Sequence, residues 1–179
     1  MSEQKSKTMS NVVYRLMALA LACSYLFMNA RKQLLKSGVK EGQTVLDFGC
    51  GPGFYAIPAA EIVGDKGKVY ALDIHPLAVQ SVQKKAEKKR LSNIATILSD
   101  IDTGLPDRSV DVSLVYDAIH MIKDREPLIR ELHRVTKPNG ILSITAEHIK
   151  AEDVIEIAEK DGLFSLRERQ RKLLNFESK

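Results

Sequence analysis

This sequence has few features of a secreted, metal-binding or membrane-spanning protein. Among its 179 residues are only two cysteines, Cys23 and Cys50, which form neither a disulfide framework nor the paired spacing of a zinc site. The apolar run from Leu16 to Met28 is too short to span a bilayer, and basic residues lie at both of its ends. Repeats, low-complexity segments and linkers are also lacking. These absences favour a cytoplasmic protein with a reduced thiol inventory.

The charge is only mildly positive, with a formal net value of +4. Five of the basic residues lie between Lys84 and Arg90, at the predicted end of a helix. No aromatic residue that could stack on bases lies nearby, so we interpret the run as a solvated helix face. The composition therefore gives no support to a nucleic-acid partner.

Apolar runs alternate with helical segments through most of the chain, which predicts a parallel sheet covered on both faces. The last two apolar runs are joined by a short polar link that permits only an antiparallel hairpin. We therefore expect an α/β, Rossmann-like three-layer sandwich that ends in an antiparallel hairpin strand. The predicted strands cover residues 44–48, 68–73, 94–100, 110–116, 141–146, 164–168 and 172–176. The predicted helices cover residues 10–37, 53–63, 76–90, 127–135 and 151–160.

The most informative segment is a glycine-rich turn at the end of the first predicted strand. Asp47 comes two residues before Gly49, and Gly51 and Gly53 follow at alternate positions. Glycine permits sharp turns and close approach of a ligand, and the following helix amino terminus suits a carboxylate. A carboxylate at position 47 would repel a pyrophosphate but attract an ammonium group. The turn thus suits a zwitterion such as the methionine half of S-adenosylmethionine.

This Asp-x-Gly-x-Gly-x-Gly pattern resembles motif I of the class I S-adenosylmethionine-dependent methyltransferases. The resemblance extends from about Gly38 to the carboxyl terminus, and is greatest to the small-molecule branch of the ubiquinone and menaquinone biosynthesis type. It implies a methyl transfer from S-adenosylmethionine to a small-molecule acceptor. A nicotinamide-dependent dehydrogenase is the rival, but its Gly-x-Gly-x-x-Gly fingerprint fails because Phe54 stands at the sixth position.

Acids also end the second and third predicted strands, at the sheet edge where ligands of open α/β sheets bind. Asp73 follows Gly51 by 22 residues, close to the spacing of a ribose-binding carboxylate. Asp100 is a candidate acceptor for the adenine amine, and Ile74 and Ile101 would clamp the adenine ring. The resemblance places the same roles at these positions. The expected cofactor-binding residues are Asp47, Gly49, Cys50, Gly51, Gly53, Asp73, Ile74, Asp100, Ile101 and Tyr116.

The sequence contains weaker signals for the residues that bind the methyl acceptor. His120 is the candidate base or positioning group, because it closely follows the fourth predicted strand. Its alternative interpretation is a surface or capping histidine. The expected acceptor-pocket residues are Tyr14, Tyr25, Asp117 and His148. No metal ligand set is expected, and a magnesium site using Asp117 with Glu147 remains an alternative.

Residues 1–37 are interpreted as an amino-terminal helical cap on a methyltransferase domain of residues 38–179. The start imitates a signal peptide, but use of a cytosolic cofactor argues against export. The predicted cap helix is apolar on all sides, so a second face needs an apolar acceptor, a partner subunit in a homodimer, or a membrane surface. A non-catalytic S-adenosylmethionine-binding module remains an alternative function.

Overall fold

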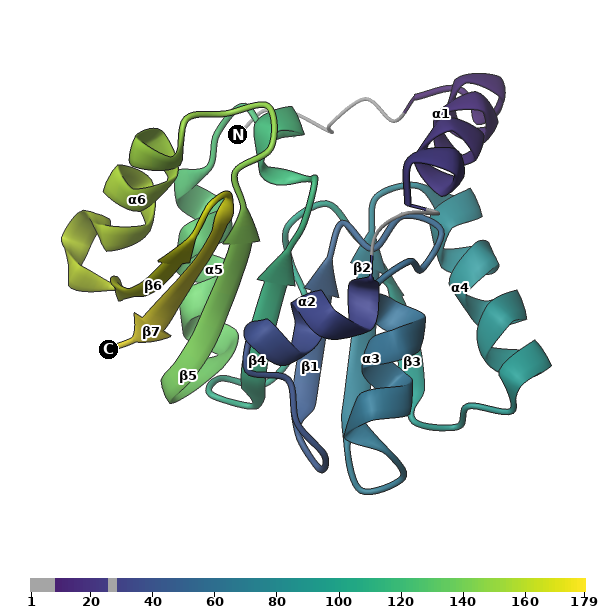
Figure 1. The fold of residues 1–179 in the computed structure, drawn as a ribbon, viewed down its shortest axis with the longest axis horizontal. Coiled ribbons are helices and arrows are strands. Elements are labelled where there is room, and N and C mark those ends of the chain that lie inside the picture. The colour runs from purple at the N-terminus through teal and green to yellow at the C-terminus, as the bar shows by residue number, and fades with distance from the viewer. Residues whose placement is uncertain (1–8, 26–28) are drawn as a thin grey trace.

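The computed structural model describes residues 9–25 and 29–179, in which one seven-stranded sheet crosses the molecule (Figure 1). The strand order is β3-β2-β1-β4-β5-β7-β6. Strands β1 to β5 are parallel, whereas β7 is antiparallel to both β5 and β6. The predicted α/β sandwich with a terminal antiparallel hairpin is confirmed. The strands are β1 (Thr44–Phe48), β2 (Lys68–Asp73), β3 (Ile94–Leu98), β4 (Val110–Val115), β5 (Thr136–Thr145), β6 (Phe164–Gln170) and β7 (Leu173–Ser178).

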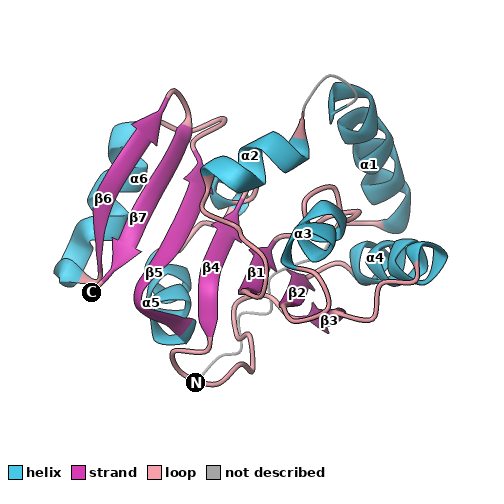
Figure 2. Cartoon of the chain, turned by 60° about the horizontal axis from the view of Figure 1, so that its bottom comes forward, coloured by secondary structure: helices cyan, strands magenta, loops and turns pink. Residues whose placement is uncertain are grey.

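Helices cover both faces of this sheet. Figure 2 shows α2 and α3 on one side and α5 and α6 on the other. The alternation of side chains along β1 supplies both layers, because Val45 packs with the α3 side and Leu46 with the α5 side. The helices are α1 (Asn11–Tyr25), α2 (Ala30–Lys36), α3 (Ala56–Val63), α4 (Pro76–Lys89), α5 (Glu126–Val135) and α6 (Ala151–Glu159), with short 3-10 turns η1 (Ile119–Met121) and η2 (Lys160–Gly162).

The strand order creates a switch point between β1 and β4. From β1 the chain continues outward through β2 and β3, and then returns to place β4 on the other side of β1. In open α/β sheets, ligands bind beyond the carboxyl ends of the strands at such a switch point. The glycine-rich turn follows β1, so the fold positions it at this switch point.

Three predicted elements differ from the structure by more than two residues at a boundary. The single helix predicted over residues 10–37 is two helices, because the Asn29 side chain accepts the N–H of Lys32 at 2.9 Å and caps α2 separately. Helix α3 begins at Ala56 rather than at Gly53, whose φ of 88° is incompatible with a right-handed helix. The expected turn at residues 138–140 is an irregular part of β5, where the register with β4 shifts.

The amino-terminal region has two parts with different environments. Leu34 of α2 is fully buried in the cluster that includes α3. In contrast, α1 leaves large aliphatic side chains exposed, including Leu16 and Leu19. Among the described side chains of α1, Tyr14 is buried against the protein and the aliphatic face is exposed, so the prediction that a second face needs an apolar acceptor, a partner subunit or a membrane surface stays a prediction. None of the helices in the described ranges is both long enough and apolar enough to cross a membrane.

Candidate functional site

The glycine-rich turn is held against the neighbouring strand by its own backbone. The N–H groups of Gly49 and Cys50 both donate to the carbonyl of Leu72, at 2.8 and 2.9 Å. Gly51 has a φ of 50°, and a Cβ added there would meet no atom within 4 Å. The turn is thus fixed on one side and open on the other, as a ligand-binding turn requires.

Asp73, at the end of β2, connects this turn to the start of α4. Its carboxylate accepts the N–H of Gly51 at 2.9 Å and the N–H of His75 at 2.8 Å. Burial raises the pKa of Asp73, and these two N–H groups oppose the rise. The side chain predicted to bind a ribose therefore also holds the glycine turn and the residue before α4 in place.

Asp47 is a buried acid with an unsatisfied oxygen. Its exposed fraction is 2%, and its Oδ2 has no hydrogen-bond partner among the described residues. Burial, and secondly the charge of Asp73, raise the pKa of Asp47 to about 7. Buried polar groups in native proteins are nearly always paired, so an orphaned carboxylate oxygen indicates a ligand that supplies the missing donor.

Tyr14 of α1 covers the same region. Its ring stacks on His75 with centroids 4.1 Å apart and an interplanar angle of 13°. Its buried hydroxyl also has no partner within the described residues. Burial, followed by the charges of Asp73 and Cys50, raises the pKa of Tyr14.

His75 has a larger role than the turn position that its sequence context suggests. Its Nδ1 accepts the N–H of Leu77 at 3.2 Å and caps α4, which leaves Nε2 as the N–H donor to the carbonyl of Met9 at 3.1 Å. The pattern His75-Pro76 signals a helix start. The sequence contains no signal for the contact with Tyr14, which depends on how α1 docks.

The side chain of Tyr116 points away from solvent into a buried hydroxyl network. Its hydroxyl contacts Ser37 at the end of α2 and lies 3.0 Å from Ser143 Oγ. Ser143 also bonds Asn175 Oδ1 at 2.7 Å, and Asn175 donates to the carbonyl of Lys36 at 3.0 Å. Burial raises the pKa of Tyr116. The side chain thus connects α2 to the sheet, and only the backbone of Tyr116 remains available for the predicted cofactor contact.

Sequence reasoning missed the other members of this network. Ser143 and Asn175 interrupt otherwise apolar strands, and this interruption is the available signal that they find buried partners. Their partners in and after α2, Ser37 and Lys36, lie more than a hundred residues away in the sequence, which a single sequence does not indicate.

Two histidines meet beyond the carboxyl ends of β4 and β5. The rings of His120 and His148 have centroids 4.9 Å apart with an edge-to-face angle of 65°. Burial, and secondly His148, lower the pKa of His120, whereas Asp117 opposes this effect. The N–H of Asp117 donates to Thr145 Oγ1 at 2.9 Å, which couples the two loops. The structure thus brings together two of the residues that the sequence analysis predicts for the acceptor side.

The remaining predicted residues occupy the expected strand ends. Asp100 is exposed just beyond β3, where it accepts the N–H of Ile101 at 2.9 Å. Ile74 and Ile101 are half-buried after β2 and β3. The side chain of Tyr25 lies outside the described residues. Within residues 9–25 and 29–179, no group of three or more His, Cys, Asp or Glu residues is arranged to hold a metal ion.

The thiol of Cys50 is buried. This burial, and secondly the charges of Asp47 and Asp73, raise the pKa of the thiol well above its ordinary value. A thiol in this state is a poor nucleophile.

Three features of the site fit S-adenosylmethionine: the open position at Gly51, the Asp47 oxygen without a described partner, and the Tyr14 hydroxyl without a described partner. An ammonium group would supply the donor that Asp47 lacks.

The comparisons with known proteins agree with this geometry. Residues 39–172 match the family described as a methyltransferase domain. Demethylmenaquinone methyltransferase of Geobacillus stearothermophilus is 33% identical over 113 residues, which cover 62% of this chain and 48% of that protein. Aklanonic acid methyltransferase DauC of Streptomyces sp. strain C5 is 32% identical over 111 residues, which cover 62% and 50%. The chain spans about half the length of these curated relatives.

Solved structures show the same fold over nearly the whole chain. A SAM-dependent methyltransferase from Aquifex aeolicus superposes with a TM-score of 0.78 at 26% identity, covering 96% of this chain and 98% of that one. A structure from Methanococcus maripaludis has a TM-score of 0.80 at 16% identity and coverages of 100% and 97%, which shows the fold alone. The strand order, the glycine turn and the family match lead to one conclusion. The chain belongs to the class I S-adenosylmethionine-dependent methyltransferase family.

Proposed function

We propose that this chain transfers a methyl group from S-adenosylmethionine to a small, partly apolar acceptor. The observation that carries the proposal is the buried, orphaned Oδ2 of Asp47 beside the glycine turn. S-adenosylmethionine supplies a methyl group on a sulfonium, whose leaving group is already activated. The protein therefore has to align the acceptor, exclude water and, for an oxygen or nitrogen acid, remove a proton.

The cofactor side is assigned by charge and position. Asp47 faces the ammonium group of the methionine moiety, and Asp73 accepts hydrogen bonds from the ribose hydroxyls while it holds Gly51. Asp100 is exposed beyond β3 and accepts from the adenine amine, with Ile74 and Ile101 beside the ring. The backbone after Tyr116 completes the pocket from β4.

The acceptor side is assigned to the loops after β4 and β5. His120 is held neutral by burial and by His148, so its ring nitrogen can accept the proton that the acceptor loses. Helix α1 supplies the cover through Tyr14, which stacks on His75 above the glycine turn. The support for a small-molecule acceptor comes from relatives whose names specify demethylmenaquinone and aklanonic acid as substrates.

The proposed function is tested by transfer of a labelled methyl group to an acceptor panel. The panel contains hydroxylated aromatic compounds with apolar substituents, and matched polar phenols and amines. Preferential transfer to the apolar hydroxylated compounds supports the proposal. Tight binding of S-adenosylhomocysteine without transfer to any acceptor would instead identify a non-catalytic module.

Replacing Tyr14 with Phe is expected to weaken cofactor binding without destabilising the protein. The phenyl ring keeps the stack on His75 but removes a buried hydroxyl that has no described partner. We expect unfolding free energy to stay equal or rise by about 1 kcal/mol, and affinity for S-adenosylhomocysteine to fall about fivefold, the value of one hydrogen bond. Urea unfolding and calorimetric titration measure the two effects. Unchanged affinity would exclude a ligand role for the hydroxyl.

Two glycines of the turn are expected to respond differently to alanine. At Gly49 the added Cβ would lie 2.6 Å from Ala118 Cβ, at a φ of 73°, so Gly49→Ala should cost about 2 kcal/mol of stability. At Gly51 the added Cβ meets no atom within 4 Å. Gly51→Ala should therefore cost only about 1 kcal/mol of stability, because alanine disfavours the left-handed backbone conformation. Its methyl would enter ligand space and reduce S-adenosylhomocysteine affinity at least about tenfold.

Gly42→Ala is the matched control for this pair. Gly42 has a φ of 79° with no atom within 4 Å of its Cβ position, and it lies before β1, at the opposite sheet edge. Its backbone cost should resemble that of Gly51→Ala, with unchanged cofactor affinity. Equal affinity losses at positions 42 and 51 would remove Gly51 from the proposed site.

A further inference from the structure

Helix α1 presents an exposed aliphatic stripe. Val12, Val13, Leu16 and Leu19 are 68%, 53%, 64% and 65% exposed, and their spacing places them on one side of the helix. The opposite side carries Tyr14, which is 4% exposed against His75. These four residues, named here the α1 stripe, add little to the protein's own core. Contiguous exposed aliphatic surface of this kind marks an interaction site.

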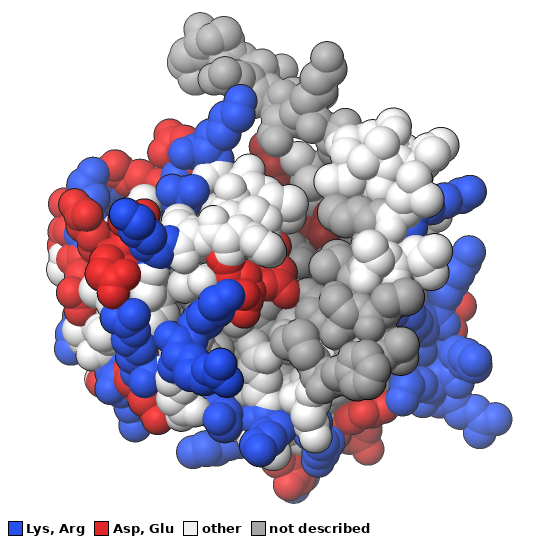
Figure 3. Space-filling model, turned by 45° about the horizontal axis from the view of Figure 1, so that its top comes forward, with Lys and Arg blue, Asp and Glu red and all other residues white. Residues whose placement is uncertain are grey.

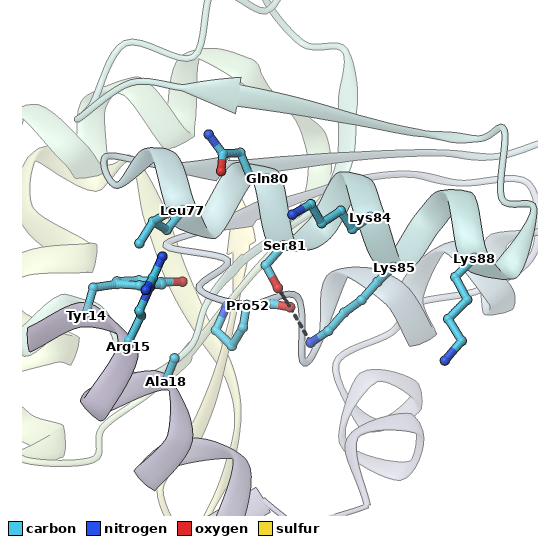
Figure 4. Close-up of a pocket in the computed structure, with 10 residues that line it drawn as sticks. All are labelled: Tyr14, Arg15, Ala18, Pro52, Leu77, Gln80, Ser81, Lys84, Lys85 and Lys88. Atoms are coloured by element: carbon cyan, nitrogen blue, oxygen red, sulfur yellow. Dashed lines mark hydrogen bonds between the residues drawn. The ribbon is translucent and has the colours of Figure 1, made fainter. Parts of the chain in front are cut away.

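A cationic groove lies directly beside the stripe. It has a volume of ≈ 470 Å³ and runs between α1 and α4, and its lining includes Tyr14, Ala18, Pro52 and Leu77 (Figure 4). The cations that also line it, named here the groove rim, are Arg15, Lys84, Lys85 and Lys88.

The charges of this rim are available to a partner. Lys85 Nζ donates to the carbonyl of Pro52 at 2.6 Å, and burial lowers the pKa of Lys85. In the described part of the chain, no carboxylate forms an ion pair with Arg15, Lys84 or Lys88. Helices α1 and α4 thus hold positive charge along the groove that no described carboxylate pairs with.

The stripe and the groove form one continuous surface. Arg15 belongs to the groove rim and is followed directly by Leu16 of the stripe. In Figure 3 the uncharged atoms of α1 lie at the upper right, and Lys and Arg side chains gather along the neighbouring edge. Aliphatic side chains bordered by cations are the combination by which peripheral helices bind bilayers with anionic headgroups.

The charges and the α1 stripe together favour an anionic bilayer over a second copy of the chain or a nucleic acid. A two-fold related second copy would bring two cationic rims into one interface, because a two-fold interface uses the same patch on both subunits. A nucleic acid would pair with the lysines but leave the aliphatic stripe in water. We propose that the α1 stripe and the α4 lysines dock this protein on an anionic lipid bilayer, with α1 lying in the headgroup region.

The test is flotation of the full chain with two kinds of vesicle at low salt. One kind contains phosphatidylcholine alone, and the other also contains phosphatidylglycerol. We expect binding to the anionic vesicles and its loss at high salt. The double variant Lys84→Gln, Lys88→Gln should bind about 25-fold more weakly, about fivefold for each lysine. Leu16→Gln with Leu19→Gln should abolish binding, and glutamine keeps the helix propensity.

The matched control is Lys40→Gln with Lys66→Gln. Both lysines are exposed in turns at the opposite edge of the sheet, and their removal gives the same net charge. The control should bind anionic vesicles like the unaltered chain, and all variants should keep the urea unfolding midpoint of the unaltered chain, which verifies folding independently of the proposed function.

Three results would overturn the proposal. The first is no binding to anionic vesicles at low salt, and the second is an equal loss of binding in both lysine pairs. The third is a dimer in solution that Leu16→Gln with Leu19→Gln converts to a monomer, which would assign the stripe to a second copy.

Discussion

Replacing Asp47 with Asn is expected to stabilise the ligand-free protein and to remove most of its cofactor affinity. Burial raises the pKa of Asp47 to about 7, so ionisation of this side chain at neutral pH is costly in the folded state. The gap between 3.8 and about 7 corresponds to roughly 4 kcal/mol. Asn has a similar shape without the charge, so we expect the variant to gain about 2 to 4 kcal/mol above pH 7.

The pH dependence of stability follows from the same carboxyl. The folded chain keeps the Asp47 proton until about pH 7, whereas the unfolded chain releases it near pH 4. The folded state binds more protons than the unfolded state between these two pH values. The contribution that Asp47 makes to the unfolding free energy is therefore fully present below pH 4 and is lost as the pH rises to about 7. Asp47→Asn should lack this loss. Urea unfolding across this range measures it, with exposed Asp65→Asn as the control for removal of a charge.

Cofactor affinity should change in the opposite sense. An ammonium ligand needs the ionised carboxylate, so the affinity for S-adenosylhomocysteine should fall about tenfold per pH unit below pH 7 and level off above it. Asp47→Asn should bind on the order of 100-fold more weakly at pH 8, because a buried charge pair loses one partner. Normal affinity in this variant, or a loss of stability without ligand, would contradict the role of Asp47.

His120→Gln is expected to reduce turnover about 100-fold when the acceptor loses a proton, the usual contribution of a positioned base. Cofactor affinity should remain unchanged, because His120 lies with His148 beyond β4 and β5 rather than at the glycine turn. His133→Gln is the control. His133 lies in the last turn of α5, where its Nε2 contacts the carbonyl of Lys179 at 3.1 Å.

The pH profile distinguishes a base from a purely structural histidine. Burial lowers the pKa of His120, so with saturating cofactor the acid limb of kcat should lie below the ordinary histidine value of about 6.5. At low cofactor concentration the titration of Asp47 should add a second limb near pH 7. Two results would contradict the role of His120 as a base. One is an equal loss of kcat in His120→Gln and His133→Gln, and the other is a kcat profile that keeps its acid limb after His120→Gln.

The parts of the fold that the sequence predicted best are strands with strong boundaries. The bounds of β1 and β2 are confirmed because an apolar run meets a glycine turn or an acid at each end. The predicted hairpin of β6 and β7 is confirmed for a similar reason, since its short polar link permits one pairing.

The parts that failed depend on local capping or on distant contacts. Asn29 is a good helix-capping residue, but the apolar run that precedes it concealed the break between α1 and α2. The hydroxyl network of Tyr116 with Ser37 joins positions 79 residues apart, which periodicity does not encode. In the site, the sequence predicted which acids end the strands, but not that Asp73 also anchors the loop or that Tyr14 stacks on His75.

We infer that the glycine turn and Asp47 bind S-adenosylmethionine. Calorimetric titration of the full chain with S-adenosylhomocysteine, beside an identical titration with NADH, is the test of this inference. The structure predicts binding of S-adenosylhomocysteine alone, with an affinity that falls as the pH decreases below about 7. Preference for NADH, or no binding of S-adenosylhomocysteine at pH 8, would contradict it.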